Sequence, residues 1–534
     1  MKKIDPQSWK ADMPLFREKA IAYAKGEIKK AEYKGFSGRY GSYAQHDPSK
    51  NMLRLRMPAG RYGSYAQHDP SKNMLRLRMP AGRVTAQKLA YIAEAIRKYN
   101  VPRAHFTTCQ TIQLHDMDAE TTSDIMEGAL DVGIVTMGGG GDFPRNTMCA
   151  PLSGVQKGEY FDVLPYAQAV GEFAMNFINA EPMPRKLKVG FSNSPENVTH
   201  ATFRDMGYAA RPDGKFDIYT AGGLGNNPRF GVKVAEAVEP DQLLFYLKAM
   251  WITFRTYGDY QNRGHARTRY LQEILGGADK YKQAYLEKLK EVYASGEDLT
   301  LHVDPIVFTK TGDGSTVSDP RVIEQKQEGL YAVAWHPIGG MPAVEDLCAV
   351  SDAMSAMEQV EMRIAPYETV YIINLTGTEA KKMLELTRNT AKTVFETSVS
   401  CIGASTCQVG VRDSQALLCA CVEAVREAKI PDGALPQIHI SGCPSSCGTH
   451  QTGEMGFRGA IKNKQSAFMF YLSGCDRQGE EKMGAELGTI LETEIPSFLV
   501  ELGQTIAASG KDYFAWKAEN PDGVEKIAAP YLAE

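Results

Sequence analysis

The chain is 534 residues long, with 43% hydrophobic and 23% charged side chains and a formal net charge of −4. These values are typical of a globular protein with three or four domains' worth of core. The lack of a basic excess excludes a general nucleic-acid binder, although local basic clusters can still bind small anions. No apolar run approaches the roughly 18 residues of a membrane span, and the N-terminus lacks the apolar stretch of a signal peptide. We therefore expect a cytoplasmic protein that contacts neither nucleic acid nor a membrane.

An exact tandem repeat lies near the N-terminus. Arg39–Gly60 and Arg61–Gly82 are identical over 22 residues. Two copies do not make a solenoid, and identity even at surface positions favours a recent duplication or an artefact. The second copy runs directly into an amphipathic helix with Thr85 as its N-cap. We therefore expect the second copy to supply the packed strand Met74–Met79.

A fainter repeat relates the two halves of the chain. Gly82 to Thr111 spans 29 positions, as does Gly340 to Thr369, and each interval holds a helix followed by a strand. Further echoes keep the same order: Asp205–Tyr208 with Glu454–Phe457, and Tyr219–Gly223 with Tyr471–Cys475. These echoes indicate two halves of similar fold, one ending near residue 300 and the other beginning near residue 325. Helices alternate with β-branched strands in both, which predicts an α/β or α+β protein with mixed sheets.

The cysteines are the strongest chemical signal. The pattern is C-x5-C, then 35 residues, then C-x3-C, formed by Cys401, Cys407, Cys443 and Cys447. Four thiolates suit zinc or an iron–sulfur cluster. Structural zinc usually takes tighter knuckles, whereas a five-residue gap of small side chains leaves room for a bulkier inorganic core. Structural zinc and four unrelated buried cysteines remain as alternatives.

With this motif the chain resembles the siroheme-dependent sulfite and nitrite reductase family, over roughly residues 35 to 530. The resemblance implies an α+β fold with a pseudo-twofold internal duplication: two ferredoxin-like half-domains plus two siroheme- and 4Fe–4S-binding α/β domains. The implied domains are an N-terminal helical extension (1–38), a first ferredoxin-like half-domain (39–118), a siroheme and substrate domain (119–310), a second ferredoxin-like half-domain (325–392) and a 4Fe–4S and siroheme domain (393–534). The implied cofactors are siroheme and a 4Fe–4S cluster. The four cysteines of the motif would hold the cluster, and Cys447 would also bridge to the siroheme iron.

Two pairs of cations stand out in the first half. Arg76 and Arg78 lie two apart on the predicted strand and therefore face the same side. Lys186 and Lys188 repeat this spacing. Stacked like charges are unfavourable unless water or an anion covers them, so the pairs indicate either an anion site or a solvated edge strand.

The family resemblance favours the anion site. It implies that Arg78, Arg145, Lys186 and Lys188 surround the substrate, with Arg56 replacing Arg78 if the first copy of the repeat is the packed one. Siroheme carries many carboxylates and needs further donors. The implied cofactor-binding residues are Arg76, Cys109, Gln110, Thr111, Gly223, Asn226, Arg263, Arg267 and Arg269.

Two positions depart from the family pattern. Cys109 stands where the family usually has Arg, and Ser445 stands where Asn is common. Lys188 favours sulfite, because nitrite reductases of the family tend to have Asn there, whereas Cys109 removes a charge and favours nitrite. The predicted function is the six-electron reduction of sulfite to sulfide, with reduction of nitrite to ammonia as the alternative.

The electron source must be separate from this chain, because the sequence contains no additional ferredoxin-type cysteine module and no dinucleotide fingerprint. We therefore expect ferredoxin or another donor protein as a partner. The missing fingerprint also disfavours a flavin- or nicotinamide-dependent oxidoreductase. A different class stays open: a non-catalytic Fe–S or zinc protein on a degenerate reductase fold.

Overall fold

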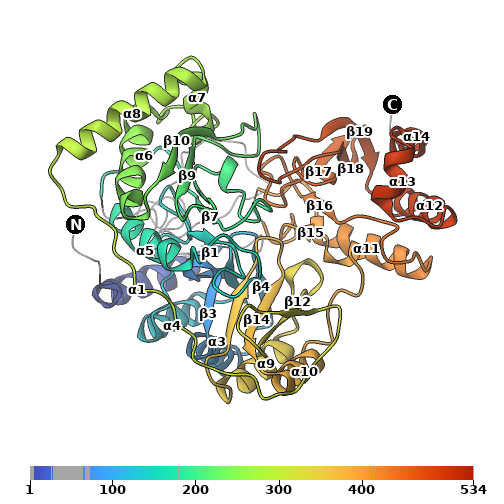
Figure 1. The fold of residues 1–534 in the computed structure, drawn as a ribbon, viewed down its shortest axis with the longest axis horizontal. Helices are drawn as coiled ribbons and strands as arrows, with labels where there is room; N and C mark the ends of the chain where they lie inside the picture. Colours follow the sequence, from blue (N-terminus) through green and yellow to red (C-terminus); the bar gives the residue numbers. More distant parts are fainter. Residues whose placement is uncertain are drawn as a thin grey trace.

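The computed structural model describes residues 5–25, 27, 64–66, 72–178, 180–407 and 409–532. Figure 1 shows three lobes, with the N-terminal half on the left and below and the C-terminal residues on the right. The first copy of the tandem repeat, 39–60, lies outside the described residues. The second copy supplies a strand close to the predicted limits, Asn73–Arg78, within a sheet.

The lower lobe is built from two small sheets, each covered by helices (Figure 1). The first has the order β1-β2-β5-β4: Ser64–Ala66, Asn73–Arg78, Thr111–Met117 and Arg103–Phe106. The second has the order β11-β12-β14-β13-β3: Val322–Glu324, Tyr331–Trp335, Val370–Leu375, Glu361–Ile364 and Arg83–Thr85. Their helices are α3 (Ala86–Tyr99), α4 (Ala119–Ala129), α9 (Val344–Ser355) and α10 (Gly377–Leu386), while α1 (Met13–Ala24) packs on α4.

The two halves of the chain are joined inside this lobe. β3 from the first half pairs with β13 from the second, and one hydrophobic core includes residues from both halves. Across this pair, Arg83 Nε donates to both carboxylate oxygens of Glu361 at 2.9 Å. Neither half can therefore unfold alone without exposing the shared core.

The two other lobes share one topology. The upper-left sheet has the order β10-β9-β8-β7-β6: Val232–Val238, Phe216–Thr220, Met206–Ala210, Val189–Ser192 and Met148–Cys149. The right-hand sheet has the order β15-β16-β17-β18-β19: Val399–Ser400, Ile438–Ser441, Met455–Lys462, Gln465–Leu472 and Ala485–Leu491. In each sheet the first two pairings in chain order are parallel and the last two antiparallel. The helices are α5 (Leu164–Met175), α6 (Leu243–Tyr257), α7 (Leu271–Ile274) and α8 (Ala278–Ala294) on the left, and α11 (Ser414–Glu427), α12 (Ile495–Ala508), α13 (Tyr513–Glu519) and α14 (Gly523–Ala528) on the right.

Several local predictions are confirmed and one is corrected. Thr85 caps α3 by accepting a hydrogen bond from Lys88 N. The strand predicted to follow the helix and to end with residues 109–114 is divided by a turn: β4 ends at Phe106 and β5 begins at Thr111, because Gln110 has a φ of +55° and turns the chain. Among the described residues, no helix is long and apolar enough to cross a membrane.

Candidate active site

The cysteine motif lies on the loops at the ends of β15 and β16. Cys401 directly follows β15, and Cys443 and Cys447 lie in the loop between β16 and β17. Gly442 N donates a hydrogen bond to Cys401 Sγ at 3.2 Å, and Ser414 Oγ lies 3.2 Å from the same sulfur. Backbone N–H donors aimed at sulfur are typical of iron–sulfur sites.

The four thiols are near enough to influence each other's ionisation. Burial, then the neighbouring Cys447, raises the pKa of Cys401 to about 12, and burial also raises the pKa of Cys407, which lies near Cys443 and Cys447. Among the residues that the structure describes, no group of three or more His, Cys, Asp or Glu is placed to hold a single metal ion.

The two predicted lysines lie next to Arg145. They precede β7 rather than forming part of a strand, yet they keep the predicted alternation, since Leu187 between them is fully buried. Arg145 N donates to Leu187 O at 2.8 Å. Burial, then the charges of Arg267 and Arg145, lowers the pKa of Lys186 well below its usual range, and Cys447 is among its charged neighbours. We call Arg76, Arg145, Lys186 and Lys188 the cation group. Lys186 lies between the rest of this group and the cluster motif, and a bound anion there would favour its charged form.

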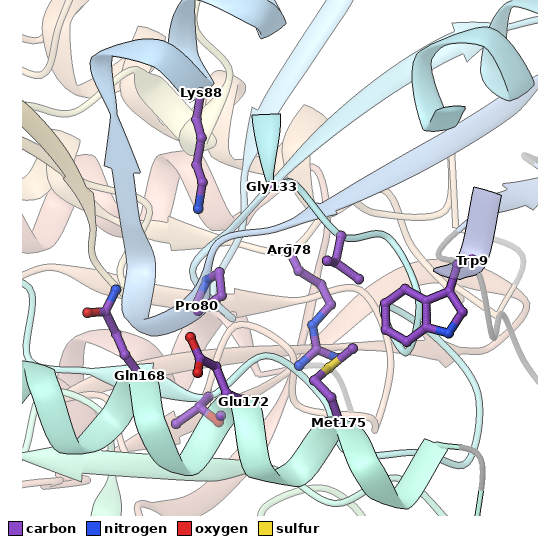
Figure 2. A pocket seen from close by; sticks show the side chains of 11 residues that line it. Trp9, Arg78, Pro80, Lys88, Gly133, Gln168, Glu172 and Met175 are labelled. Atoms are coloured by element: carbon purple, nitrogen blue, oxygen red, sulfur yellow. The ribbon is translucent and has the colours of Figure 1, made fainter. Parts of the chain in front are cut away.

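The two arginines of β2 have different surroundings. Arg78 is buried, and its guanidinium donates to Met137 O, Pro144 O and Arg145 O at 3.1 to 3.3 Å. It borders a cavity of about 190 Å³ that also includes Trp9 (Figure 2). That volume is below the roughly 300 Å³ at which small-molecule pockets begin. Arg78 thus supports the loop that carries Arg145, and its contact with substrate stays a prediction.

Arg76 instead belongs to the cation group. Its Nη1 donates to Gly139 O at 2.6 Å, and Arg145 Nη1 donates to the same oxygen at 2.8 Å. Its charge lowers the pKa of Cys109. The run of glycines at residues 138–141 therefore holds Arg76 and Arg145 side by side.

Cys109 lies in the turn between β4 and β5, within the cation group. Asn146 Nδ2 donates to its carbonyl oxygen at 3.1 Å. Burial by itself would raise the pKa of this thiol, but the charges of Lys188, Arg204, Arg76 and Lys186 together lower it to about 6. A thiolate is therefore favoured at neutral pH where the family pattern has an arginine.

The predicted cofactor arginines are anchored by other parts of the first half. Arg263 pairs with Asp142 at 2.8 Å, and Arg267 pairs with Asp205 at 3.0 Å. Arg269 Nε donates to Asn226 O at 2.9 Å, which fixes the turn that also contains Gly223. These contacts hold the guanidinium groups in place and leave their contact with siroheme a prediction.

The glycine-rich turn rests directly on the cysteine loop. Gln451 and Gly225 exchange two hydrogen bonds, from Gly225 N to Oε1 at 3.1 Å and from Nε2 to Gly225 O at 2.9 Å. A Cβ at Gly225 would lie 3.4 Å from Pro444 O, between two of the cluster cysteines. The turn predicted for the cofactor and the loop predicted for the cluster thus form one surface.

Gln110 and Thr111 face the protein interior. Gln110 Nε2 donates to Cys149 O at 2.7 Å and to Ile364 O at 2.6 Å, so both amide hydrogens are used. Thr111 Oγ1 lies 2.8 Å from Thr107 Oγ1, and both threonines are buried. Their observed role is to hold the turn that presents Cys109, while contact with a cofactor stays a prediction.

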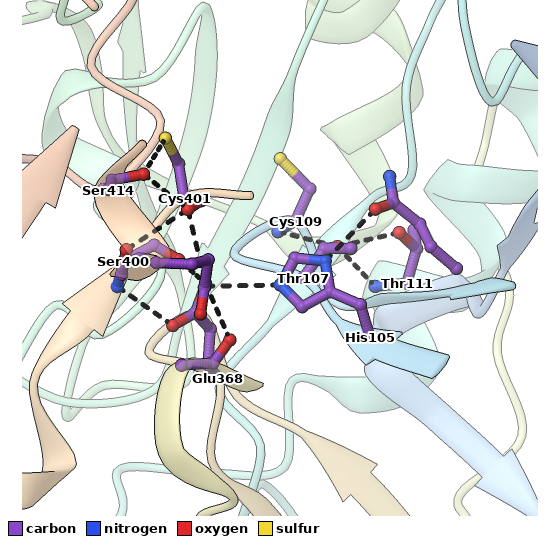
Figure 3. Close-up of polar contacts among 12 residues, drawn as sticks. His105, Thr107, Cys109, Thr111, Glu368, Ser400, Cys401 and Ser414 are labelled. Atoms are coloured by element: carbon purple, nitrogen blue, oxygen red, sulfur yellow. Dashed lines mark hydrogen bonds and ion pairs between the residues drawn. The ribbon is translucent and has the colours of Figure 1, made fainter. Parts of the chain in front are cut away.

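A buried polar row links the cation group to the cluster motif (Figure 3). Glu368 Oε2 accepts from Ser400 N at 3.1 Å, one residue before Cys401, and Glu368 Oε1 lies 3.6 Å from His105 Nε2. Gln113 lies between His105 and Arg76, and with its oxygen toward Arg76 it accepts at 2.6 and 3.1 Å. Burial raises the pKa of Glu368. Its members share no motif, so this row could not be predicted from the sequence.

Comparison with known proteins gives consistent results. Residues 65–132 match the nitrite/sulfite reductase ferredoxin-like half domain, and residues 140–292 match the nitrite and sulphite reductase 4Fe-4S domain. The chain is 26% identical over 398 residues to the ferredoxin–nitrite reductase of Synechococcus elongatus, covering 71% of this chain and 74% of that protein. It is 24% identical over 393 residues to sulfite reductase [ferredoxin] 1 of Mycolicibacterium paratuberculosis, covering 70% of this chain and 68% of that protein.

A solved structure has the same fold. The Mycobacterium tuberculosis NirA protein superimposes with a TM-score of 0.68 at 22% identity, covering 82% of this chain and 85% of that one. The matched residues, 65–132 and 140–292, are thus two domains of the nitrite and sulfite reductase family. The matched 4Fe-4S domain is the lobe with the cations, which contains only Cys149, so the placement of the cluster rests on the cysteine motif of the opposite lobe.

The family implies siroheme and a 4Fe–4S cluster, and the side chains present fit both. Four thiols with an N–H donor on one sulfur suit the cluster, and a group of cations around Lys186 suits a polycarboxylate ring and a small anion. The glycine-rich turn of the first half contacts the cysteine loop of the second through the hydrogen bonds between Gly225 and Gln451.

Proposed function

We propose that this protein reduces sulfite to sulfide by six electrons. The observation that carries the proposal is the position of Lys186 and Lys188 beside Arg145, with the charge of Cys447 acting on Lys186. Sulfite carries up to two negative charges near neutral pH, and an anion of higher charge than nitrite suits a site with two lysines and an arginine. The same group places the anion next to the source of electrons.

In this proposal Cys401, Cys407, Cys443 and Cys447 would hold the cluster, and Cys447 would also connect it to siroheme. When bound, the two cofactors supply the electron-transfer chemistry. Lys186, Lys188 and Arg145 attract the anion and stabilise charge on its oxygens as the bonds to them break. The lysine ammonium groups also donate protons, so that each oxygen leaves as water.

Nitrite is the second candidate, supported by Cys109. A thiolate among four cations lowers the positive charge of the pocket, which suits a monoanion better than a dianion. The similar proteins include both ferredoxin–nitrite reductases and a sulfite reductase [ferredoxin]. They also support ferredoxin as the electron donor of this chain.

The test is anaerobic turnover of the purified protein with reduced viologen or ferredoxin, with sulfite and nitrite side by side. Sulfide and ammonium are measured, and a siroheme absorption band is recorded. A higher kcat/KM for sulfite is expected. A higher kcat/KM for nitrite would replace sulfite by the second candidate, and iron without a siroheme band or turnover would favour a non-catalytic Fe–S protein.

A further inference from the structure

Arg204 lies next to Cys109 and has no role in the sites described so far. It follows the 3-10 turn Ala201–Phe203 and precedes β8. Asp205, the next residue, accepts a hydrogen bond from Lys188 N at 2.8 Å, so this part of the chain borders the proposed anion site. Among the cations that lower the pKa of Cys109, Arg204 ranks second after Lys188.

The charge of Arg204 is not neutralised by a carboxylate. No acidic side chain in the described part of the chain lies within ion-pair distance of it, whereas Arg263 and Arg267 each have an aspartate partner. Its Nε donates to Thr199 O at 2.8 Å and its Nη2 lies 3.3 Å from His200 Nδ1, which leaves Nη1 without a hydrogen-bond partner among the described residues. The guanidinium is thus held on one side and available on the other.

A pair formed by the buried His200 and the partly buried Asp476 fixes this orientation. His200 is 1% exposed and stacks on Phe203 with ring centroids 4.7 Å apart. Its Nε2 lies 3.0 Å from Asp476 Oδ2 and 2.9 Å from Tyr367 Oη, and Tyr367 donates to the same carboxylate oxygen. A proton on Nε2 facing Asp476 leaves the Nδ1 lone pair to accept from Arg204.

We propose that Arg204, held by His200 and Asp476, supplies to the anion pocket the positive charge that Cys109 does not supply. The charge expected at position 109 from the family pattern is thus relocated from the β4–β5 turn to the β7–β8 loop. The ligand is an anionic group, either a siroheme carboxylate or the substrate oxyanion. This inference rests on the proposed function only for the identity of that ligand.

The charge relation between Arg204 and Cys109 is tested first, without using turnover. The rate at which iodoacetamide alkylates Cys109 in the full chain is followed against pH by peptide mass spectrometry, at matched siroheme content. Removing the charge with Arg204→Gln should move the thiol from a pKa of about 6 toward its ordinary value, which lowers the alkylation rate at pH 7 about tenfold. Arg204→Lys should keep most of the rate, and Arg211→Gln, which removes an arginine paired with Asp217, should leave it unchanged. An unchanged rate in Arg204→Gln would overturn the proposal.

Turnover then tests the relocation of the charge. Arg204→Gln should raise KM for the preferred anion about tenfold with a smaller change in kcat. The double variant Cys109→Arg with Arg204→Gln restores the charge at the family position and should return KM to within about threefold of wild type. Failure of this rescue at equal siroheme content would overturn the proposal. If the wild-type protein reduces neither anion, the proposed function fails, and the alkylation profile still decides the role of Arg204.

The positioning role of His200 has its own test. Asp476→Asn removes the carboxylate but leaves Arg204 in the chain, and should lower the alkylation rate at pH 7 by about threefold, less than Arg204→Gln. The matched control is Asp512→Asn, at the N-cap of α13 in the same lobe, which should leave the rate unchanged. An effect of the control as large as that of Asp476→Asn would exclude specific positioning by Asp476.

Discussion

The two outer lobes have the same sheet topology but carry different side chains on corresponding loops. In the left lobe the loop after β7 covers residues 193–205, and in the right lobe the loop after β16 covers residues 442–454, so the two loops are equally long. Both close against a glycine: a Cβ at Gly207 would lie 1.7 Å from Ala201 O, and one at Gly456 would lie 1.8 Å from His450 O.

Equal loop length allows residue-by-residue comparison. Cys443 and Cys447 correspond to Ser194 and Val198, whereas His200 and Arg204 correspond to Thr449 and Gly453. One loop therefore carries two of the cysteines proposed to hold the cluster, and its counterpart carries the histidine and the arginine proposed to serve the anion pocket. The duplicated sheet therefore sets where these loops lie, while the side chains on each loop decide its chemistry.

The largest effect should come from removing a thiol of the right-hand loop. Cys447→Ser should lower turnover at least about 100-fold, because it removes a ligand of the cluster rather than one of its supporting groups. Iron and acid-labile sulfide are measured together with turnover. Cys419→Ser, on the exposed side of α11, is the matched control and should change neither. Full iron content and activity in Cys447→Ser would contradict the assignment of chemistry to this loop.

The cations of the left lobe should produce the next largest effect. Lys186→Met removes a charge that stabilises the oxygens of the anion and should lower kcat/KM about 100-fold, with the iron content unchanged. Steady-state kinetics and iron analysis check this expectation. Lys290→Met, on the exposed face of α8, serves as the control. Loss of iron in Lys186→Met would show that the two lobes do not divide the chemistry as proposed.

The ion pair between Arg83 on β3 and Glu361 on β13, which joins the two halves, should contribute to the free energy of unfolding and make it depend on pH. Glu361 on β13 accepts from Arg83 on β3 and from Arg363. Burial raises the pKa of Glu361, but Arg363 and Arg83 outweigh burial and hold it below its usual range. Its stabilisation is therefore present above the unfolded pKa of about 4.3 and is lost as pH falls through the lower, folded pKa.

Glu361→Gln should cost about 2 kcal/mol at pH 7, less than the loss of a fully buried pair because Arg83 keeps some contact with water. Urea unfolding at pH 7 and at pH 4 measures this cost, and the difference between variant and wild type should shrink at the lower pH. Glu423→Gln, exposed on α11, should have no effect. A cost that is the same at both pH values would contradict the role of the carboxylate charge.

Much of the fold and the cluster motif could be predicted because the signals are local. The Thr85 cap and the alternation of Lys186 and Lys188 about a buried Leu187 need only a few neighbouring residues. The turn between β4 and β5 was not predicted, because Gln110, which has a positive φ there, is held by contacts with Cys149 and with Ile364, 254 residues away.

Arg204 escaped the sequence analysis for a related reason. Its surroundings depend on His200, whose partners Tyr367 and Asp476 lie 167 and 276 residues further along the chain. No spacing within one segment carries that information. Only the repeated segment that begins one residue later, Asp205–Tyr208 with Glu454–Phe457, marked this part of the chain as duplicated.

The smallest expected effect tests whether the duplication still gives the two halves equal energetics. In the repeat register Asp118 corresponds to Thr376, and each caps a helix: Asp118 accepts from Thr121 N at 2.7 Å, and Thr376 accepts from Glu379 N at 3.3 Å. Asp118→Ala and Thr376→Ala should each cost about 1 kcal/mol in urea unfolding. Exposed helix positions, Glu120→Ala and Lys381→Ala, serve as controls. Because Glu379 also accepts from Thr376 N, only the second helix has a reciprocal cap, so the Thr376 variant should be the more costly of the two. A larger cost at Asp118 would mean that packing around α4, rather than the cap itself, sets the stability of the first half.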